Sequence, residues 1–280
     1  GNGSFLAIIV EDLGPRYNER LTTKGLEKVN INTFDAKDKY RHWTGGGHKI
    51  HATNSIIESA HDIALLFKQD INSISCYKKW DGKIKKYSED LAGYDGWKNI
   101  EEYFRIINYC TNYVVLRNFE CLPQEYHIKD HGDIDLLVEN KDEIIYLSNA
   151  KPIYNEKYRI YHTIKINGED VPFDFRYIGD NYYDYFWQKK ILENKREFNG
   201  FYRPNDQDYF YSLIYHAIIH KPQLSTDYSK RLKKLSSKMN VKNIDFKNTK
   251  NLLNILNQFM MMNNYQFTDP IDQSVFFNFN

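Results

Sequence analysis

Two aspartates that stand two positions apart are the strongest chemical signal in the sequence. Asp133 and Asp135 flank Ile134 at the start of an apolar run that ends at Val138. On a β-strand, side chains two residues apart lie on the same face, so the two carboxylates point together and Ile134 points into the core. Carboxylates held this close repel each other, and a divalent cation removes that cost. Because hard oxygen ligands suit Mg²⁺ or Mn²⁺, the segment predicts a metal site.

A third carboxylate stands on a later segment that also has the composition of a strand. Asp174 lies between Phe173 and Phe175, and alternation puts both rings on the opposite face of the strand. Arg176, two positions further on, shares the face of Asp174. We expect Asp174 to join the first two aspartates across a sheet.

The order of these segments resembles the nucleotidyltransferase superfamily of DNA polymerase β type. Residues 132–138, Gly-Asp-Ile-Asp-Leu-Leu-Val, follow a helix and a strand that ends in Val-Leu-Arg-Asn-Phe-Glu, and precede the strand with the third aspartate. The resemblance covers roughly residues 98–178. It implies that Asp133 and Asp135 are ligands of two metal ions and that Asp174 is a ligand or a general base. The ions would activate an acceptor hydroxyl and stabilise the leaving pyrophosphate.

The turn before the aspartates departs from that family. The family has a Gly-Ser or Gly-Gly pair there, whose backbone N–H groups hold the phosphates of the nucleotide, whereas this chain has Arg117 and Asn118. Their side chains are candidates for binding the phosphates, together with Gly132 and Arg176. The substitution also leaves open a relative that moves a phospho-alcohol from a nucleotide-activated donor onto a sugar, as choline-phosphate transferases of surface polysaccharides do.

A second candidate site lies near the N-terminus. Residues 48–55, His-Lys-Ile-His-Ala-Thr-Asn-Ser, and the apolar run after them are similar to the active-site segment of nucleoside diphosphate kinases. That resemblance implies that His51 carries the phosphoryl group and that Asp62 orients it. Too few residues precede His51 for the rest of the kinase fold, and the family's Asn three before it is His48 here. A degenerate module that binds a nucleotide or only packs is therefore favoured over a working kinase.

Two other groups in the C-terminal part are interpreted as structural. His216 and His220 stand four apart in a helical pattern and share a face, which favours a supporting role near the site over substrate contact. The basic residues between 230 and 238 are typical of a solvated helix face.

The fold predicted around these residues is α+β. A mixed nucleotidyltransferase-like sheet with helices is preceded by a small kinase-like α/β unit and followed by a helical C-terminal subdomain. The expected divisions are a kinase-like unit at 1–70, a hairpin and linker at 71–96, the catalytic domain at 97–180 and a helical accessory region at 181–280. Strands are expected at 5–10, 113–116, 134–138, 158–166 and 171–178, with an irregular segment at 16–44. Helices are expected at 55–67, 97–110, 182–192, 206–220, 229–239 and 251–262.

Two Asx-Gly pairs predict β-hairpins. Asp81-Gly82 separates the strand-like segments 74–80 and 83–87, and Asn167-Gly168 separates the strands expected at 158–166 and 171–178.

Composition narrows the class of partner. The formal net charge of +1 gives no field that attracts a polyanion, so a nucleic acid is possible but not indicated. The three cysteines lack a Cys-x-x-Cys spacing and do not favour a disulfide framework or a zinc site. No apolar stretch reaches the ~18–20 residues of a membrane span, and no signal segment is evident, which favours a cytoplasmic protein.

The function expected from these features is metal-dependent transfer. The expected donor is a nucleotide, such as ATP, or a nucleotide-activated compound. The expected acceptor is a hydroxyl or phosphate group of a small molecule, for example a sugar. Two alternatives stay open: a phosphotransferase of nucleoside diphosphate kinase type that uses His51, and a non-catalytic module that binds a nucleotide.

Overall fold

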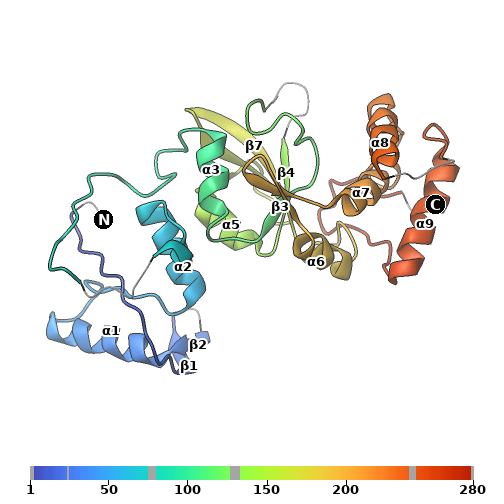
Figure 1. Cartoon of the computed structure of the whole chain (residues 1–280). Helices are drawn as coiled ribbons and strands as arrows, with labels where there is room; N and C mark the ends of the chain where they lie inside the picture. Colours follow the sequence, from blue (N-terminus) through green and yellow to red (C-terminus); the bar gives the residue numbers. More distant parts are fainter. Residues whose placement is uncertain (1–2, 24, 75–79, 127–132, 240–243, 279–280) are drawn as a thin grey trace. The chain divides into compact units, whose positions relative to one another are not determined.

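The computed structural model of the chain describes residues 3–23, 25–74, 80–126, 133–239 and 244–278. The chain divides into two compact units, Gly1–Ala92 and Gly93–Asn280. Both units combine helices with strands, and the described residues form eight α-helices and a mixed sheet (Figure 1). The prediction of an α+β fold is confirmed at this level.

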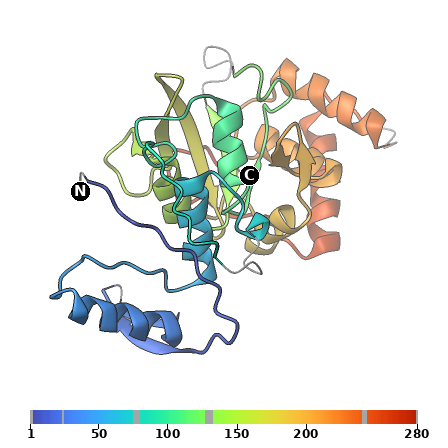
Figure 2. The same cartoon turned by 60° about the vertical axis from the view of Figure 1, so that its left-hand side comes forward.

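The first unit begins with a hairpin that runs directly into a helix. Strands β1 (Tyr17–Thr22) and β2 (Gly25–Asn30) pair antiparallel and lead into α1 (Ile31–Trp43) (Figure 2). The side chain of Asn30 caps this helix. The expectation of an irregular segment over 16–44 is wrong. Both strands are short and mostly solvated, so they lack the apolar alternation by which a half-buried strand is recognised.

The second helix of this unit agrees with its sequence pattern. Helix α2 (Ile56–Phe67) begins after Ser55, whose side chain accepts a hydrogen bond from the backbone N–H of Glu58. Its buried residues, Ile63, Ala64 and Leu65, lie in its last two turns. A single turn of 3₁₀-helix, η1 (Ile71–Ser73), follows.

Two strand predictions in the first unit are not met. Residues 5–10 are described but form no strand, and Phe5 is 73% exposed. An apolar run becomes a buried strand only beside a partner strand, and the β1–β2 sheet does not extend to it. Of the hairpin expected around Asp81-Gly82, residues 75–79 lie outside the described residues, and residues 83–87 form no strand.

The second unit is built on a mixed five-stranded sheet. Its strand order is β3-β4-β7-β6-β5, in which β4 and β7 run parallel and the other neighbours antiparallel. The hairpin predicted at Asn167-Gly168 is confirmed, and both turn residues have positive φ. The strands are β3 (Tyr113–Val115), β4 (Ile134–Val138), β5 (Lys151–Pro152), β6 (Tyr161–Ile166) and β7 (Glu169–Tyr177).

Helices α3 (Ile100–Ile107) and α5 (Lys141–Ser148) lie side by side (Figure 1). Tyr103 of α3 packs against Phe173 of β7 with ring centroids 5.3 Å apart, so α3 covers the face of the sheet opposite to Asp174. The helix expected at 97–110 is confirmed in a shorter form. Helix α5 was not expected, because its two turns are too short for an apolar periodicity to be recognised.

The C-terminal part is helical, as predicted, with one hairpin inserted. Strands β8 (Arg196–Phe198) and β9 (Phe201–Arg203) were missed, since three residues each give no readable alternation. No helix among the described residues combines the length and apolar character that crossing a membrane requires. The four predicted helices are confirmed as α6 (Tyr185–Glu193), α7 (Asp206–Ile218), α8 (Thr226–Lys238) and α9 (Thr249–Asn263).

Candidate metal centre

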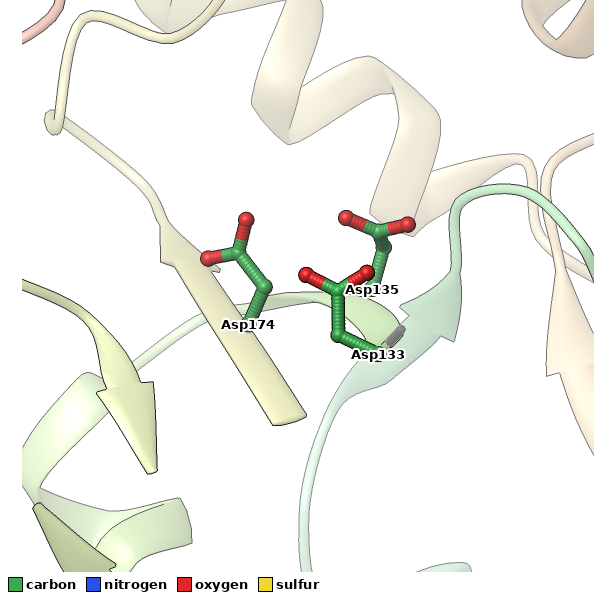
Figure 3. A group of neighbouring side chains, drawn as sticks. All are labelled: Asp133, Asp135 and Asp174. Carbon is green, nitrogen blue, oxygen red and sulfur yellow. The ribbon is translucent and has the colours of Figure 1, made fainter. Parts of the chain in front are cut away.

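The sheet brings the three aspartates together. The parallel register of β4 and β7 pairs Asp135 with Asp174, and Asp133, two residues before Asp135, projects from the same face. Figure 3 shows the three carboxylates extending from the two neighbouring segments toward a common side. One carboxylate oxygen of each residue can be chosen so that all three lie within 4.8 Å of one another. This spacing allows one cation to contact all three side chains.

Each buried aspartate has an arginine partner. Asp135 and Asp174 are both 1% exposed, whereas Asp133 is half-buried. The Nη2 of Arg117 donates to Oδ1 of Asp135. Arg176 donates to Oδ2 of Asp174 from Nε at 3.2 Å and from Nη2 at 2.9 Å. Within the described part of the chain, the second oxygen of Asp174, Oδ1, is buried without a hydrogen-bond partner.

The electrostatics of the cluster favour an added cation. Burial raises the pKa of Asp133 above its ordinary value, and repulsion from Asp174 raises it further. Burial also raises the pKa of Asp135 well above its ordinary value, although the Arg117 charge opposes the change. A cation bound between the carboxylates would therefore stabilise their charged forms. Three carboxylates with one free buried oxygen are a donor set that fits Mg²⁺ or Mn²⁺.

A layer of buried aromatic and imidazole rings supports the two arginines. The ring centroid of Tyr182 lies 4.2 Å from the guanidinium of Arg176 and 5.7 Å from that of Arg117. The Tyr182 hydroxyl lies 2.6 Å from Nδ1 of His216, and the His220 ring packs on Tyr182 at 4.1 Å. Burial lowers the pKa of both histidines, so they are neutral at pH 7. Their position agrees with a supporting role.

A pocket of about 740 Å³ adjoins the cluster, and Asp133 is the one aspartate of the three on its wall. The remaining wall comes from the segment after β3, the start of β7, the β8–β9 hairpin and helices α7 and α8. Much of it is apolar or aromatic, which is usual for a small-molecule site. Its apolar and aromatic residues include Phe119, Leu122, Tyr126, Ile134, Val171, Pro172, Phe198, Tyr209 and Leu235.

Three basic residues of α8 line this pocket, a contact that was not expected from the sequence. Lys234 and Lys238 are solvent-exposed, as interpreted, and Arg231 is half-buried. They stand at i, i+3 and i+7, which places them on one side of a helix, together with Leu235. That spacing, with an apolar residue inside the basic run, was the signal that could have identified them.

The four residues expected to bind phosphate have different surroundings. Arg117 and Arg176 are paired with the aspartates of the cluster. Asn118 lines the pocket with a left-handed φ of 60°, and its Oδ1 accepts from Nη1 of Arg231 at 2.6 Å. Gly132 lies outside the described residues. Of the three that the structure describes, Asn118 is the one that lines the pocket without engaging the cluster.

The second candidate site has a looser geometry. In the first unit, Nε2 of His51 lies 3.9 Å from Oδ2 of Asp62, too long for a hydrogen bond. Oε1 of Glu58, which the sequence analysis missed, lies at the same distance. Glu58 stands one helical turn before Asp62 on α2, and that spacing was the available signal. The His51 side chain is 65% exposed.

Comparison with known protein families, curated proteins and solved structures gives no match for this chain. The site therefore has to be interpreted from its own geometry.

Proposed function

We propose that the unit Gly93–Asn280 is a divalent-metal-dependent transferase of nucleotidyltransferase type. It moves a nucleotidyl or phospho-alcohol group from a nucleotide or nucleotide-activated donor onto a hydroxyl or phosphate acceptor, sugars included. The observation that carries the proposal is a cluster of three carboxylates, one with a free buried oxygen, beside a pocket of about 740 Å³ that Asp133 lines. The pocket has the volume of a site for a small molecule.

The three aspartates have different tasks in this proposal. Asp133, Asp135 and Asp174 would hold Mg²⁺ or Mn²⁺, which supplies positive charge where the transferred phosphate and its leaving group gather negative charge. Asp133 lies on the pocket wall and is thus placed to contact both the ion and the substrate. The free Oδ1 of Asp174 serves as a ligand or accepts the proton of the acceptor hydroxyl.

The pocket supplies groups that suit a phosphorylated substrate. The Arg231 guanidinium is held by Asn118 and by Asp227, whose Oδ2 lies 2.9 Å from its Nε. A guanidinium fixed in this way binds a phosphate with little further loss of side-chain freedom. Lys234, on the same side of α8, adds a second positive charge, and Phe119 and Tyr126 offer aromatic surface to a base or an apolar group.

A thermal-shift screen tests the proposal on the full chain. Nucleoside triphosphates and nucleotide-activated sugars and alcohols are each added with Mg²⁺, with Mn²⁺ and with EDTA. We expect at least one donor class to raise the melting temperature only when the metal is present, because ligand-linked stability follows the occupancy of the site. The Asp174→Asn variant should lose this metal-dependent increase, and Asp62→Asn, in the first unit, should keep it.

Two results would contradict the proposal in different ways. If nucleotides stabilise the protein without metal and this stabilisation disappears in His51→Ala, the nucleotide binds to the first unit. Metal-dependent stabilisation that persists in Asp174→Asn would remove the carboxylate cluster from the site.

A further inference from the structure

Two buried arginines contact the carboxylate cluster, and they hold it in different ways. Arg117 is paired with Oδ1 of Asp135. Arg176 places both of its hydrogen bonds on a single oxygen of Asp174, Oδ2. The other oxygen of Asp174 has no hydrogen-bond partner among the described residues. Asp174 thus keeps a free buried ligand atom, whereas Asp135 already shares an oxygen with a cation of the protein.

The charge balance limits how many ions this site accepts. Arg176 also lies 4.0 Å from the buried Asp272, whose second ion-pair partner is Arg159. The four carboxylates and three guanidiniums together leave one negative charge uncompensated. One divalent ion changes this to a single positive charge. A second ion would leave three positive charges around buried groups, where repulsion between like charges is poorly screened. A second ion therefore needs negative charge from outside the protein.

Arg117 is held beside Asp135 by its surroundings. Its side chain is buried, and its guanidinium lies over the ring of Tyr182. Tyr182 is fixed in turn by His216 and by the Arg176 guanidinium. A buried guanidinium that left Asp135 would lose both its ion pair and its aromatic contact, so the arginine is a lasting part of the cluster.

We propose that Arg117 acts as a built-in cation of the cluster and limits the substrate-free protein to one divalent ion, held by Asp133, Asp135 and the free Oδ1 of Asp174. The inference rests on the proposed function, and it differs from the two-ion site that the sequence resemblance implies. Arg117 is a positioning residue here, since it acts through Asp135. The phosphates of a bound substrate supply the charge that a second ion needs.

Binding of Mn²⁺ tests the inference without an activity assay. The full chain is titrated at pH 7 without nucleotide, and free Mn²⁺ is followed by electron paramagnetic resonance. We expect one Mn²⁺ per chain for the wild type and loss of that binding in Asp174→Asn. In Arg117→Gln we expect an affinity at least ~10-fold higher, equivalent to ~1.4 kcal/mol, or a second equivalent of Mn²⁺.

Two further variants control this experiment. Arg203 is also partly buried and ion-paired, to Asp206 at 3.0 Å, but contacts no aspartate of the cluster, so Arg203→Gln should bind Mn²⁺ like the wild type. Arg117→Gln combined with Asp135→Asn removes one charge of each sign and leaves the balance unchanged. This double variant should show neither the higher affinity nor the second equivalent of Mn²⁺ that is expected of Arg117→Gln.

Arg117→Gln leaves Asp135 as an unpaired buried charge, which can unfold the variant when no metal is present. In that case Mn²⁺ should restore its folding in a thermal-shift assay, because the ion replaces the missing positive charge. Failure of millimolar Mn²⁺ to do so would overturn the inference.

The outcomes separate this inference from the proposed function. Two Mn²⁺ ions on the substrate-free wild type, or an Arg117→Gln variant that binds Mn²⁺ like the wild type, would overturn the role of Arg117 while leaving the metal site. Absence of Mn²⁺ binding in the wild type and in all variants would overturn both.

Discussion

The two candidate sites of this chain differ in what holds their residues. The aspartates of the second unit lie on adjacent strands, whose register pairs Asp135 with Asp174 and buries both. His51 of the first unit stands before α2, largely exposed, with its nearest carboxylate oxygens 3.9 Å away. A sheet brings together residues that are distant in sequence and withdraws them from water, which strengthens their electrostatics. Residues that are merely close in sequence, as around His51, are not withdrawn from water in this way. Similarity to an active-site segment is therefore weaker evidence for a functional site than a buried cluster of charged residues.

The largest expected effect is on turnover. Once a donor is identified, Asp135→Asn should lower its turnover at least ~10²-fold, the scale for loss of one preorganised electrostatic group. The matched change in the first unit, Asp62→Asn, should leave turnover unchanged. A variant that removes both Asp133 and Asp135 should lose little more than either single variant, because groups that act as a unit are not additive. Turnover by Asp135→Asn at the wild-type rate would show that the carboxylate cluster is not the catalytic site and would leave the first unit as the candidate.

The next effect concerns stability and separates two aspartates that the sequence treats alike. Without metal, Asp135→Asn should lower the free energy of unfolding by ~3 kcal/mol, because it leaves the buried Arg117 without its partner. Asp133 has no arginine within ion-pair distance among the described residues, and Asp174 repels it. Asp133→Asn should therefore leave stability unchanged or slightly higher. Urea denaturation in EDTA measures both, and equal losses would contradict the assigned pairing.

A smaller effect is expected in the pH dependence of stability. Burial raises the pKa of Asp180, in the second unit, to about 6, although the carboxylate accepts hydrogen bonds from Tyr182 and Gln188. Since the folded pKa exceeds the unfolded value, the charged carboxylate costs stability above pH 6. The unfolding free energy of the wild type relative to Asp180→Asn should fall by ~3 kcal/mol between about pH 4 and pH 7.

Asp12 of the first unit should show the opposite trend. Hydrogen bonds from Asn30 and Asn32 lower its pKa, so its contribution is present above the ordinary aspartate pKa and is lost as the pH falls through the lowered value. Urea denaturation of wild type, Asp180→Asn and Asp12→Asn, from pH 7 down to well below the ordinary aspartate pKa of 3.8, measures both trends. The same sign of pH dependence for the two aspartates would show that burial does not distinguish them.

No effect is expected from the kinase-like segment. Incubation with γ-labelled ATP should leave no acid-labile label above the level of His51→Ala, because no carboxylate of the described residues lies within hydrogen-bonding distance to fix the His51 tautomer. Label that accumulates on the wild type and is lost in His51→Ala would show a working phosphohistidine site there.

Local patterns explain which parts of the fold could be predicted. Strand 134–138, the Asn167-Gly168 hairpin and the C-terminal helices have periodicities or turn residues that act over a few positions. The strand expected at 5–10 failed because an apolar run is a strand only when another strand pairs with it. The hairpin β8–β9 was missed because three residues per strand give no period.

The sequence by itself determined that Asp133 and Asp135 share a face and that a third aspartate lies on a strand, since alternation is a property of the local backbone. Tertiary structure alone decided that β4 and β7 are parallel neighbours in the register that pairs Asp135 with Asp174. It also decided that Arg117 turns inward to the cluster while Arg231, more than a hundred residues later, joins the pocket. These contacts depend on chain segments that meet only after folding, because a side chain's charge partner is set by distance in space.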